Sequence, residues 1–231
     1  MAMTQDELKR RVAQAALAHV LPSLGAGRIV GVGTGSTTNY FIDALASVKE
    51  RFDAAVSSSD ASAERLAAHG IEVLDLNDVD AVAVYVDGAD EVEPGGALIK
   101  GGGGAHTREK IVAAASEVFV CIVDDSKMVN TLGAFGVPVE VVPMARRSAA
   151  RRLQSLGGDV RERGGFVTDN GNAVLDVHGL SIAEPHAIEA RFNNVAGVVE
   201  NGIFAVNRPD LVLVGTSDGV REFTPSDGPR P

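Results

Sequence analysis

The chain has 231 residues, of which 45% are hydrophobic, 23% charged and 4% aromatic, with one cysteine and no tryptophan. This composition is typical of a globular protein with a sizeable core and excludes disordered and collagen-like chains, while the lone Cys121 excludes an intramolecular disulfide framework. The formal net charge of −10 argues against sequence-independent binding to nucleic acid or to an anionic membrane.

The first half of the chain alternates predicted helices with short apolar strands. Strands are expected at residues 27–33, 53–59, 81–86 and 118–123, and helices at 6–21, 40–48, 60–69 and about 107–116. Pro22 and Gly70 end two of these helices, and Asp60 is the expected N-cap of a third. Because the strands are almost continuous runs of Val, Ile and Ala, they predict an α/β fold: a mostly parallel, Rossmann-like open sheet with helices on both faces.

The pattern changes after Pro138. An Arg-rich helix is expected at residues 145–156, a hairpin turn at Asn170–Gly171 and a strand at 173–177, before residues 210–215 return to the main sheet. We predict a main α/β domain of residues 1–129 and 207–231, and a smaller α+β subdomain of residues 130–206. The Pro- and Gly-containing tail after Phe223 is expected to be disordered.

The first motif with chemical potential is the segment Gly31–Thr37, which links a predicted strand to a helix. It differs from a dinucleotide-binding fingerprint because Ser36 stands where the third glycine is required. Backbone N–H groups, hydroxyl groups and a helix N-terminus together can bind a phosphate. Taken alone, the segment is equally consistent with a tight turn in which Ser36 or Thr37 caps the helix.

A second motif, Asp87-Gly88-Ala89-Asp90-Glu91, follows the apolar strand 81–86 directly. Ligands of open α/β sheets bind at this edge, where carboxylates can hold sugar hydroxyls or move protons. A solvated acidic turn is the alternative interpretation. The spacing of a calcium-binding loop is absent.

The third motif begins at Lys100 and continues through four glycines to a helix that starts near Thr107, its expected N-cap. The glycines allow close approach of the backbone to a ligand, and Lys100 adds a cation. Glu109 falls in the first turn, where the helix dipole keeps it ionised and available as a base. A flexible linker and simple dipole stabilisation are the alternatives.

The fourth motif, Asp124-Asp125-Ser126-Lys127, again follows a buried strand, and Lys127 can reach an anion. A surface turn is the alternative. All four motifs lie at the carboxyl ends of predicted parallel strands, so we expect them to meet in one crevice. Independent surface turns would not be placed in this way.

These motifs, in this order, resemble those of the A-type ribose-5-phosphate isomerase family. The resemblance runs from Thr4 to Val220 and rests on the ordered set Gly-Thr-Gly-Ser-Thr, Ser-Ser-Ser-Asp, Asp-Gly-Ala-Asp-Glu, Lys-Gly-Gly-Gly, Thr-Arg-Glu-Lys and Asp-Asp-Ser-Lys. It implies interconversion of D-ribose 5-phosphate and D-ribulose 5-phosphate through an enediolate, in the non-oxidative pentose phosphate pathway, without a metal or cofactor. It also implies a homodimer or a dimer of dimers.

The resemblance also implies roles for individual residues. The proton-shuttling base is Glu109, Asp87 handles hydroxyl protons and ring opening, Asp90 holds sugar hydroxyls, and Lys100 with Gly101, Gly102 and Gly103 stabilises the oxyanion. The phosphate site is implied at Thr34, Gly35, Ser36, Thr37 and Lys127, with a further contribution from Lys9. Gly88 and Ala89 complete the implied substrate-binding set.

Two other functions deserve comparison with an isomerase. A non-catalytic sugar-phosphate sensor needs a DNA-binding segment, but only about 26 residues precede the first predicted strand. A coenzyme A transferase with a Glu nucleophile has no support outside the Gly-rich loops. No apolar run approaches the ~18 residues of a membrane helix and no signal peptide is evident, so we expect a soluble protein of the reducing cytoplasm.

Overall fold

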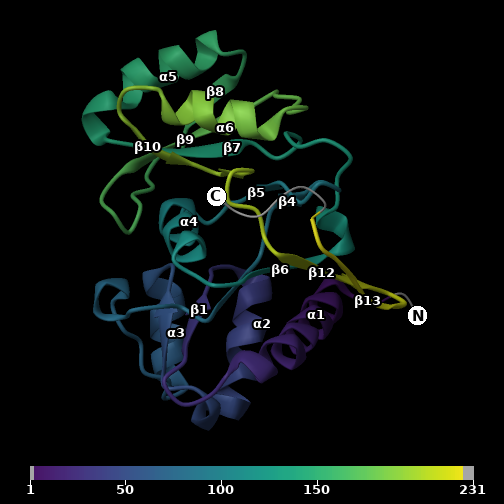
Figure 1. Ribbon diagram of the computed structural model, residues 1–231. Helices are drawn as coiled ribbons and strands as arrows, with labels where there is room; N and C mark the ends of the chain where they lie inside the picture. Colours follow the sequence, from purple (N-terminus) through teal and green to yellow (C-terminus); the bar gives the residue numbers. More distant parts are fainter. Residues whose placement is uncertain (1–2, 226–231) are drawn as a thin grey trace. The chain divides into compact units, whose positions relative to one another are not determined.

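The computed structural model describes residues 3–225 (Figure 1). These residues form two compact units, which are described separately. The first unit contains the residues up to Gly88, Arg108–Lys127 and the residues from Pro209 on; the second contains Ala89–Thr107 and Met128–Arg208. The expected domain boundaries near residues 130 and 206 lie close to two of these crossings, while segment 89–107, expected in the main domain, groups with the second unit.

The first unit is built on a six-stranded sheet with the order β13-β12-β6-β3-β1-β2. Its strands are β1 (Ile29–Val32), β2 (Ala54–Ser57), β3 (Val84–Asp87), β6 (Phe119–Asp124), β12 (Leu211–Thr216) and β13 (Gly219–Phe223). All neighbouring strands are parallel except β12 and β13, which form an antiparallel hairpin. The predicted mostly parallel open sheet is therefore confirmed.

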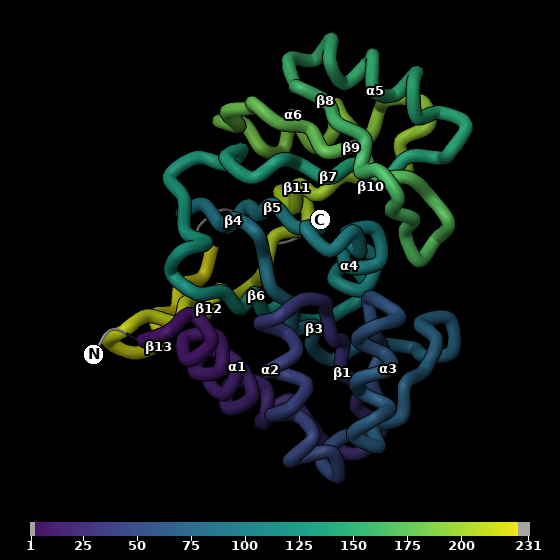
Figure 2. Tube along the Cα trace, turned by 180° about the vertical axis from the view of Figure 1, so that it is seen from behind, coloured from purple at the N-terminus to yellow at the C-terminus, as the bar shows by residue number. Residues whose placement is uncertain are grey.

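Helices cover both faces of this sheet. They are α1 (Gln5–Val20), α2 (Ser36–Leu45), α3 (Asp60–Ala68) and α4 (His106–Ala114), whose residues from Arg108 on belong to the first unit. The helices α1 and α2 lie side by side (Figures 1 and 2) and share a core with Val30 and Val32 of β1. Because successive residues of a strand face opposite sides of the sheet, Gly31 faces the side away from α1 and α2. On that side it lies against Val112 of α4.

Local sequence accounts for the ends of α1. The Thr4 hydroxyl accepts from the N–H of Glu7 at 3.3 Å, while the Glu7 carboxylate accepts from the N–H of Thr4 at 2.7 Å. This reciprocal capping box satisfies two N–H groups that the first helical turn leaves open. Pro22 then falls in the short 3-10 helix Leu21–Ser23, so the helix ends where the sequence predicts. Further 3-10 segments are Ala46–Arg51, Leu76–Asp78 and Asp125–Lys127.

The second unit is an α+β structure, as predicted for the smaller part of the chain. Its four-stranded antiparallel sheet has the order β10-β7-β9-β8, formed by β7 (Val137–Val141), β8 (Asp159–Glu162), β9 (Ala173–His178) and β10 (Val198–Asn201). A smaller sheet contains β4 (Glu91–Val92), β5 (Leu98–Ile99) and β11 (Ile203–Phe204). The helices α5 (Arg146–Ser155) and α6 (Pro185–Asn193) pack on these sheets (Figure 2). The 3-10 segment Pro143–Ala145 directly precedes α5.

Two predicted helix starts are wrong. The N-cap of α3 is Ser59, whose hydroxyl accepts from the N–H of Ser62, and Asp60 is already helical. The helix α4 starts at His106, so Thr107 lies within the helix. The Thr107 hydroxyl, expected to cap the helix, donates instead to the buried carboxylate of Glu140. From residue 226 on, the tail expected to be disordered lies outside the described residues. Within residues 3–225, no helix is both long and apolar enough to cross a membrane.

Candidate active site

Asp87 ends strand β3 and is fully buried. Its Oδ1 accepts from the backbone N–H of Thr34 at 2.9 Å, from the N–H of Gly88 at 2.7 Å and from the Thr38 hydroxyl at 3.3 Å. Its Oδ2 accepts from the Tyr85 hydroxyl at 2.6 Å. A buried carboxylate is tolerated only when donors replace its water, and here several donors hold it in one orientation.

Two glycines of the neighbouring region make room for this arrangement. Gly31 pairs with Tyr85 in the parallel ladder, and a methyl group on Gly31 would lie 2.9 Å from the tyrosine ring. A methyl group on Gly33 would lie 1.9 Å from Cγ of Asp87. The two glycines therefore leave the space that Tyr85 and Asp87 occupy on one face of the sheet.

A second carboxylate, Glu109, lies in the first turn of α4 and is also buried. Burial of the Tyr85 hydroxyl raises its pKa well above its usual range, and the negative charges of Asp87 and Glu109 raise the pKa further. The phenol is therefore a permanent donor near neutral pH. Asp87 contacts this phenol directly, whereas Glu109 acts on it through its charge.

The loop after β1 leads into the N-terminus of α2. Gly35 has φ of 114°, a conformation that favours glycine, and precedes the first helical residue Ser36 without a side-chain cap. Gly35 and Ser36 are exposed, and Thr34 and Thr37 are half-buried. Uncapped N–H groups and the positive end of the helix dipole can bind an anion here, as predicted for a phosphate.

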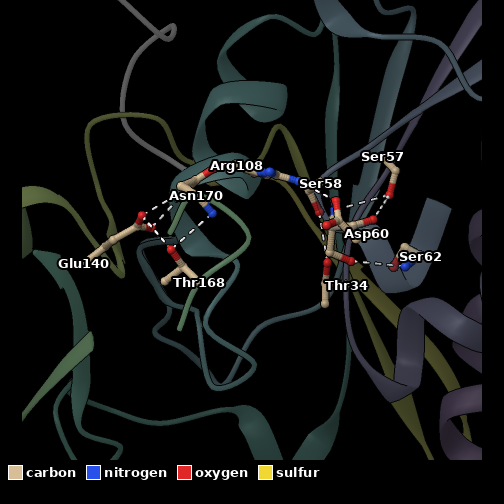
Figure 3. A network of polar contacts seen from close by, with 10 residues as sticks. Thr34, Ser57, Ser58, Asp60, Ser62, Arg108, Glu140, Thr168 and Asn170 are labelled. Atoms are coloured by element: carbon tan, nitrogen blue, oxygen red, sulfur yellow. Dashed lines mark hydrogen bonds and ion pairs between the residues drawn. The ribbon is translucent and has the colours of Figure 1, made fainter. Parts of the chain in front are cut away.

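Hydroxyl groups surround the base of this loop (Figure 3). The Thr34 hydroxyl lies 3.1 Å from the hydroxyl of the fully buried Ser58, and the Ser62 hydroxyl donates to the carbonyl of Gly33 at 2.7 Å. On the same unit, Arg108 of α4 pairs with Asp60 of α3 at 2.7 Å. The loop is thus anchored to the segment that follows β2.

Lys127 ends a 3-10 turn that directly follows β6. The carboxylate of Asp124 accepts from both the backbone N–H and the hydroxyl of Ser126, which closes this turn. Lys127 is half-buried. Lys9 lies on α1, with its Nζ 4.0 Å from the carboxylate of Asp6.

The remaining predicted residues lie in the second unit. Asp90 is half-buried, and its carboxylate accepts from the N–H of Gly102 at 2.8 Å. Lys100 is only 2% exposed, its N–H donates to the carbonyl of Gly202 at 2.8 Å, and its ammonium lies 5.5 Å from the centre of the Phe204 ring. Gly101 has φ of 99°, and a methyl group there would lie 2.7 Å from the His106 ring. The glycine loop is therefore a folded turn and not a flexible linker.

The second unit also contains a buried hydrogen-bond network around the carboxylate of Glu140, which was not predicted from the sequence. Glu140 of β7 accepts from the hydroxyls of Thr107 and Thr168 at 2.5 and 3.0 Å, and from the side-chain amides of Asn170 and Asn172 at 3.1 and 2.7 Å. Figure 3 shows Thr168 and Asn170 turned toward this carboxylate. Burial raises the pKa of Glu140, but these donors outweigh burial and hold the pKa below its usual value.

Comparison with known proteins decides the family. The sequence model described as Ribose 5-phosphate isomerase A (phosphoriboisomerase A) matches residues 54–219. The crystal structure of ribose 5 phosphate isomerase A from Neisseria gonorrhoeae is 46% identical and aligns with 98% of this chain and 100% of its own, at a TM-score of 0.93. The chain belongs to the ribose 5-phosphate isomerase A family. The enzyme from Methanocaldococcus jannaschii is 38% identical over 96% of this chain and 100% of its own, at a TM-score of 0.88.

A further member of this family is a D-ribose-5-phosphate isomerase solved in complex with phospho-erythronic acid. It is 36% identical and covers 96% of this chain and 100% of its own, at a TM-score of 0.90. The family suggested by the ordered motifs is thereby confirmed.

The structure places some predicted residues in direct contact. In the first unit, Thr34 and Gly88 donate to Asp87, and in the second unit Gly102 donates to Asp90. Tyr85, Thr38 and Ser58 were not predicted as site residues, although Tyr85 and Asp87 share a strand face by simple alternation. Among residues 3–225, no group of three or more His, Cys, Asp or Glu side chains is arranged to hold a metal ion.

Proposed function

We propose that this protein interconverts D-ribose 5-phosphate and D-ribulose 5-phosphate through an enediolate. The observation that carries the proposal is family membership, with 46% identity over 98% of the chain to a ribose 5 phosphate isomerase A. The first unit agrees with it, because it holds two buried carboxylates, Asp87 and Glu109, and the charges of both raise the pKa of the Tyr85 phenol, to which Asp87 is also hydrogen-bonded. Enediolate chemistry needs a carboxylate base and a second group that moves hydroxyl protons.

In the proposed reaction, Glu109 removes the proton from C2 of the open-chain aldose, and the electron pair passes into the C1–C2 bond. The carbonyl oxygen on C1 becomes an enediolate oxygen. Glu109 then delivers a proton to C1, while a proton moves from the C2 hydroxyl to the C1 oxygen. Asp87 is proposed to carry this hydroxyl proton and to open the sugar ring, since its carboxylate is held rigidly by N–H and O–H donors.

Residues of the second unit are assigned by their match to the family motifs. Asp90 is proposed to hold sugar hydroxyls, and Lys100 with the N–H groups of Gly101, Gly102 and Gly103 to stabilise the developing oxyanion. The burial of Lys100 supports this role, because an ammonium in a site of low dielectric acts more strongly on a nearby charge than in water. Gly88 and Ala89 are proposed to line the substrate between the two aspartates.

The phosphate group is proposed to bind the loop Thr34–Thr37 together with Lys127. The loop offers the uncapped N-terminus of α2, whose first residue is Ser36, and two threonine hydroxyls. Lys127 lies in the 3-10 turn after β6, a strand separated from β1 by β3, and would add local positive charge to a chain with a net charge of −10. A role for Lys9 in this site stays a prediction.

Three broader properties belong to the same proposal. The enzyme is proposed to act as a homodimer or a dimer of dimers, in the cytoplasm, without a metal or cofactor. The acidic net charge supports the expectation that it does not bind nucleic acid.

The decisive experiment replaces the proposed base. Glu109→Gln is expected to fold normally and to lower kcat for ribulose 5-phosphate formation by about a hundredfold or more, the scale of a lost general base. Glu64→Gln, the same change at an exposed position of α3, is the matched control and is expected to leave kcat unchanged. Near-normal turnover in Glu109→Gln would refute the role of Glu109. Binding of ribose 5-phosphate to the unaltered protein without any turnover would favour a sensor.

A further inference from the structure

The proposed mechanism makes no use of Tyr85, yet the structure gives this side chain an unusual position. Its ring and hydroxyl are fully buried, and the hydroxyl donates to Oδ2 of Asp87 at 2.6 Å. Buried hydroxyl groups normally find a partner, but a charged carboxylate is among the strongest partners available. A phenylalanine would fill the same space, so packing does not explain the hydroxyl.

The ring of Tyr85 is fixed from two sides. Its centre lies 5.3 Å from that of Phe119 on β6, with 40° between the ring planes. On β1, Gly31 provides the space for the ring, since a methyl group there would approach it to 2.9 Å. The phenol oxygen is therefore held by strands on both sides of β3, independently of the carboxylate that it contacts.

The contacts of Asp87 are divided between its two oxygens. Oδ1 accepts from two backbone N–H groups, those of Thr34 and Gly88, and from the Thr38 hydroxyl, whereas the phenol reaches Oδ2. The donors on Oδ1 orient the plane of the carboxylate, and the phenol adds a donor from a rigid ring to Oδ2. Rotation about the Cβ–Cγ bond of Asp87 therefore weakens hydrogen bonds at both oxygens.

We propose that Tyr85 is a positioning residue for the isomerisation, which orients the Asp87 carboxylate through its hydrogen bond to Oδ2. Because Asp87 acts on substrate only in the proposed isomerase, this inference rests on that function. Burial and the charges of Asp87 and Glu109 raise the pKa of the phenol, so it stays protonated and available as a donor near neutral pH. The nearby Ser58 side chain lowers the pKa of the phenol, but burial and the two carboxylates outweigh this effect.

Thr34 connects Asp87 to the segment that follows β2. Its backbone N–H donates to Asp87, and its hydroxyl lies 3.1 Å from that of Ser58. These contacts hold Asp87 in a fixed relation to the loop proposed to bind the phosphate.

The test is Tyr85→Phe, with Tyr40→Phe as its matched control. The chain has two tyrosines, and Tyr40 lies on α2, where its ring packs against the core that α1 and α2 share and lies under Arg10. Loss of a hydrogen bond to a charged group is expected to lower kcat by about tenfold to a hundredfold. Since Tyr85 does not touch the phosphate loop directly, KM is expected to stay within about threefold. Tyr40→Phe is expected to change neither constant.

A double-mutant cycle separates this inference from the role of Asp87 itself. If Tyr85 acts through Asp87, Tyr85→Phe has no further effect on kcat in the Asp87→Asn background. Full activity in Asp87→Asn alone would overturn the role of Asp87. A large loss in Asp87→Asn with unchanged kcat in Tyr85→Phe would overturn the role of Tyr85 and leave the isomerase assignment intact. A lower melting temperature in Tyr85→Phe with unchanged kcat would show that the hydroxyl is only structural.

A second measurement keeps Tyr85 in the chain and does not depend on an activity assay. In Tyr40→Phe the chain retains one tyrosine and has no tryptophan, so the absorbance at about 295 nm reports the Tyr85 phenol alone. Adding Asp87→Asn removes one of the two negative charges near the phenol, the other being Glu109. The phenol is then expected to ionise at least about one pH unit lower. Circular dichroism at each pH separates ionisation in the folded protein from alkaline unfolding, and the same phenol titration in two variants that are both still folded would overturn the contact on which the inference depends.

Discussion

At the scale of single residues, Glu140 shows how a buried charge can stabilise one unit of the chain. Its carboxylate replaces lost water with donors from Thr107, Thr168, Asn170 and Asn172. In Glu140→Gln, the side-chain NH2 group would face the hydroxyl and amide donors that now bind the carboxylate. Several of these donors would then lack an acceptor. We expect the variant to lose about 3 kcal/mol of unfolding free energy at pH 7, measured by urea unfolding.

The pH dependence of this effect has a definite sign. The pKa of Glu140 is lowered in the folded protein from a usual value of 4.5, so its contribution is fully present above that value and is lost as the pH falls through the folded pKa. The stability difference between the wild type and Glu140→Gln should therefore shrink below about pH 4.5. Glu162→Gln, which removes an exposed partner of Arg146 in the same unit, should cost less than about 1 kcal/mol. A difference that stays constant down to acid pH would contradict this account.

At the scale of elements, the end of strand β1 depends on the absence of a side chain at position 33. A methyl group on Gly33 would overlap Cγ of Asp87 at 1.9 Å, so Gly33→Ala must displace the carboxylate or the loop. A displacement of about 1 Å in a catalytic group costs on the order of a hundredfold in rate. We expect this loss in kcat/KM for ribose 5-phosphate, with a native circular dichroism spectrum. Gly25→Ala, whose added methyl group lies 4.0 Å from its nearest neighbour, should keep full activity.

The same glycines show what sequence patterns can and cannot predict about an element. The strands and most helix ends follow from local signals, such as the Val and Ile runs, Pro22 and the Asn170–Gly171 turn. Gly31 and Gly33 were interpreted as residues of a phosphate-binding turn, but they also accommodate Tyr85 and Asp87. That role depends on the register between β1 and β3, which brings together residues about 50 positions apart and has no signal in either strand alone. Thr107 was misplaced for the same reason, since its partner Glu140 is 33 residues away.

At the scale of the whole molecule, the chain passes between its two units four times within the described residues, after Gly88, Thr107, Lys127 and Arg208. Three of these crossings directly adjoin motifs that the sequence analysis selected. The composition change near Pro138 reveals the second unit but not the inclusion of residues 89–107, because the strands of that segment are only two residues long. The order of the motifs predicted the family correctly, although the predicted main domain included residues 89–107, which group with the second unit.

The proposed proton transfer by Glu109 makes a final prediction for the intact enzyme. When ribose 5-phosphate is converted in D2O in the presence of a chelator such as EDTA, turnover should continue and ribulose 5-phosphate should carry deuterium on C1. A carboxylic acid exchanges its proton with solvent before returning it, and incomplete exchange lowers the deuterium content without removing it. A metal-assisted hydride shift moves hydrogen directly between carbons and introduces no deuterium. Mass spectrometry of the product distinguishes the two routes, and loss of activity in EDTA that added metal restores, or a product free of deuterium, would contradict the carboxylate mechanism.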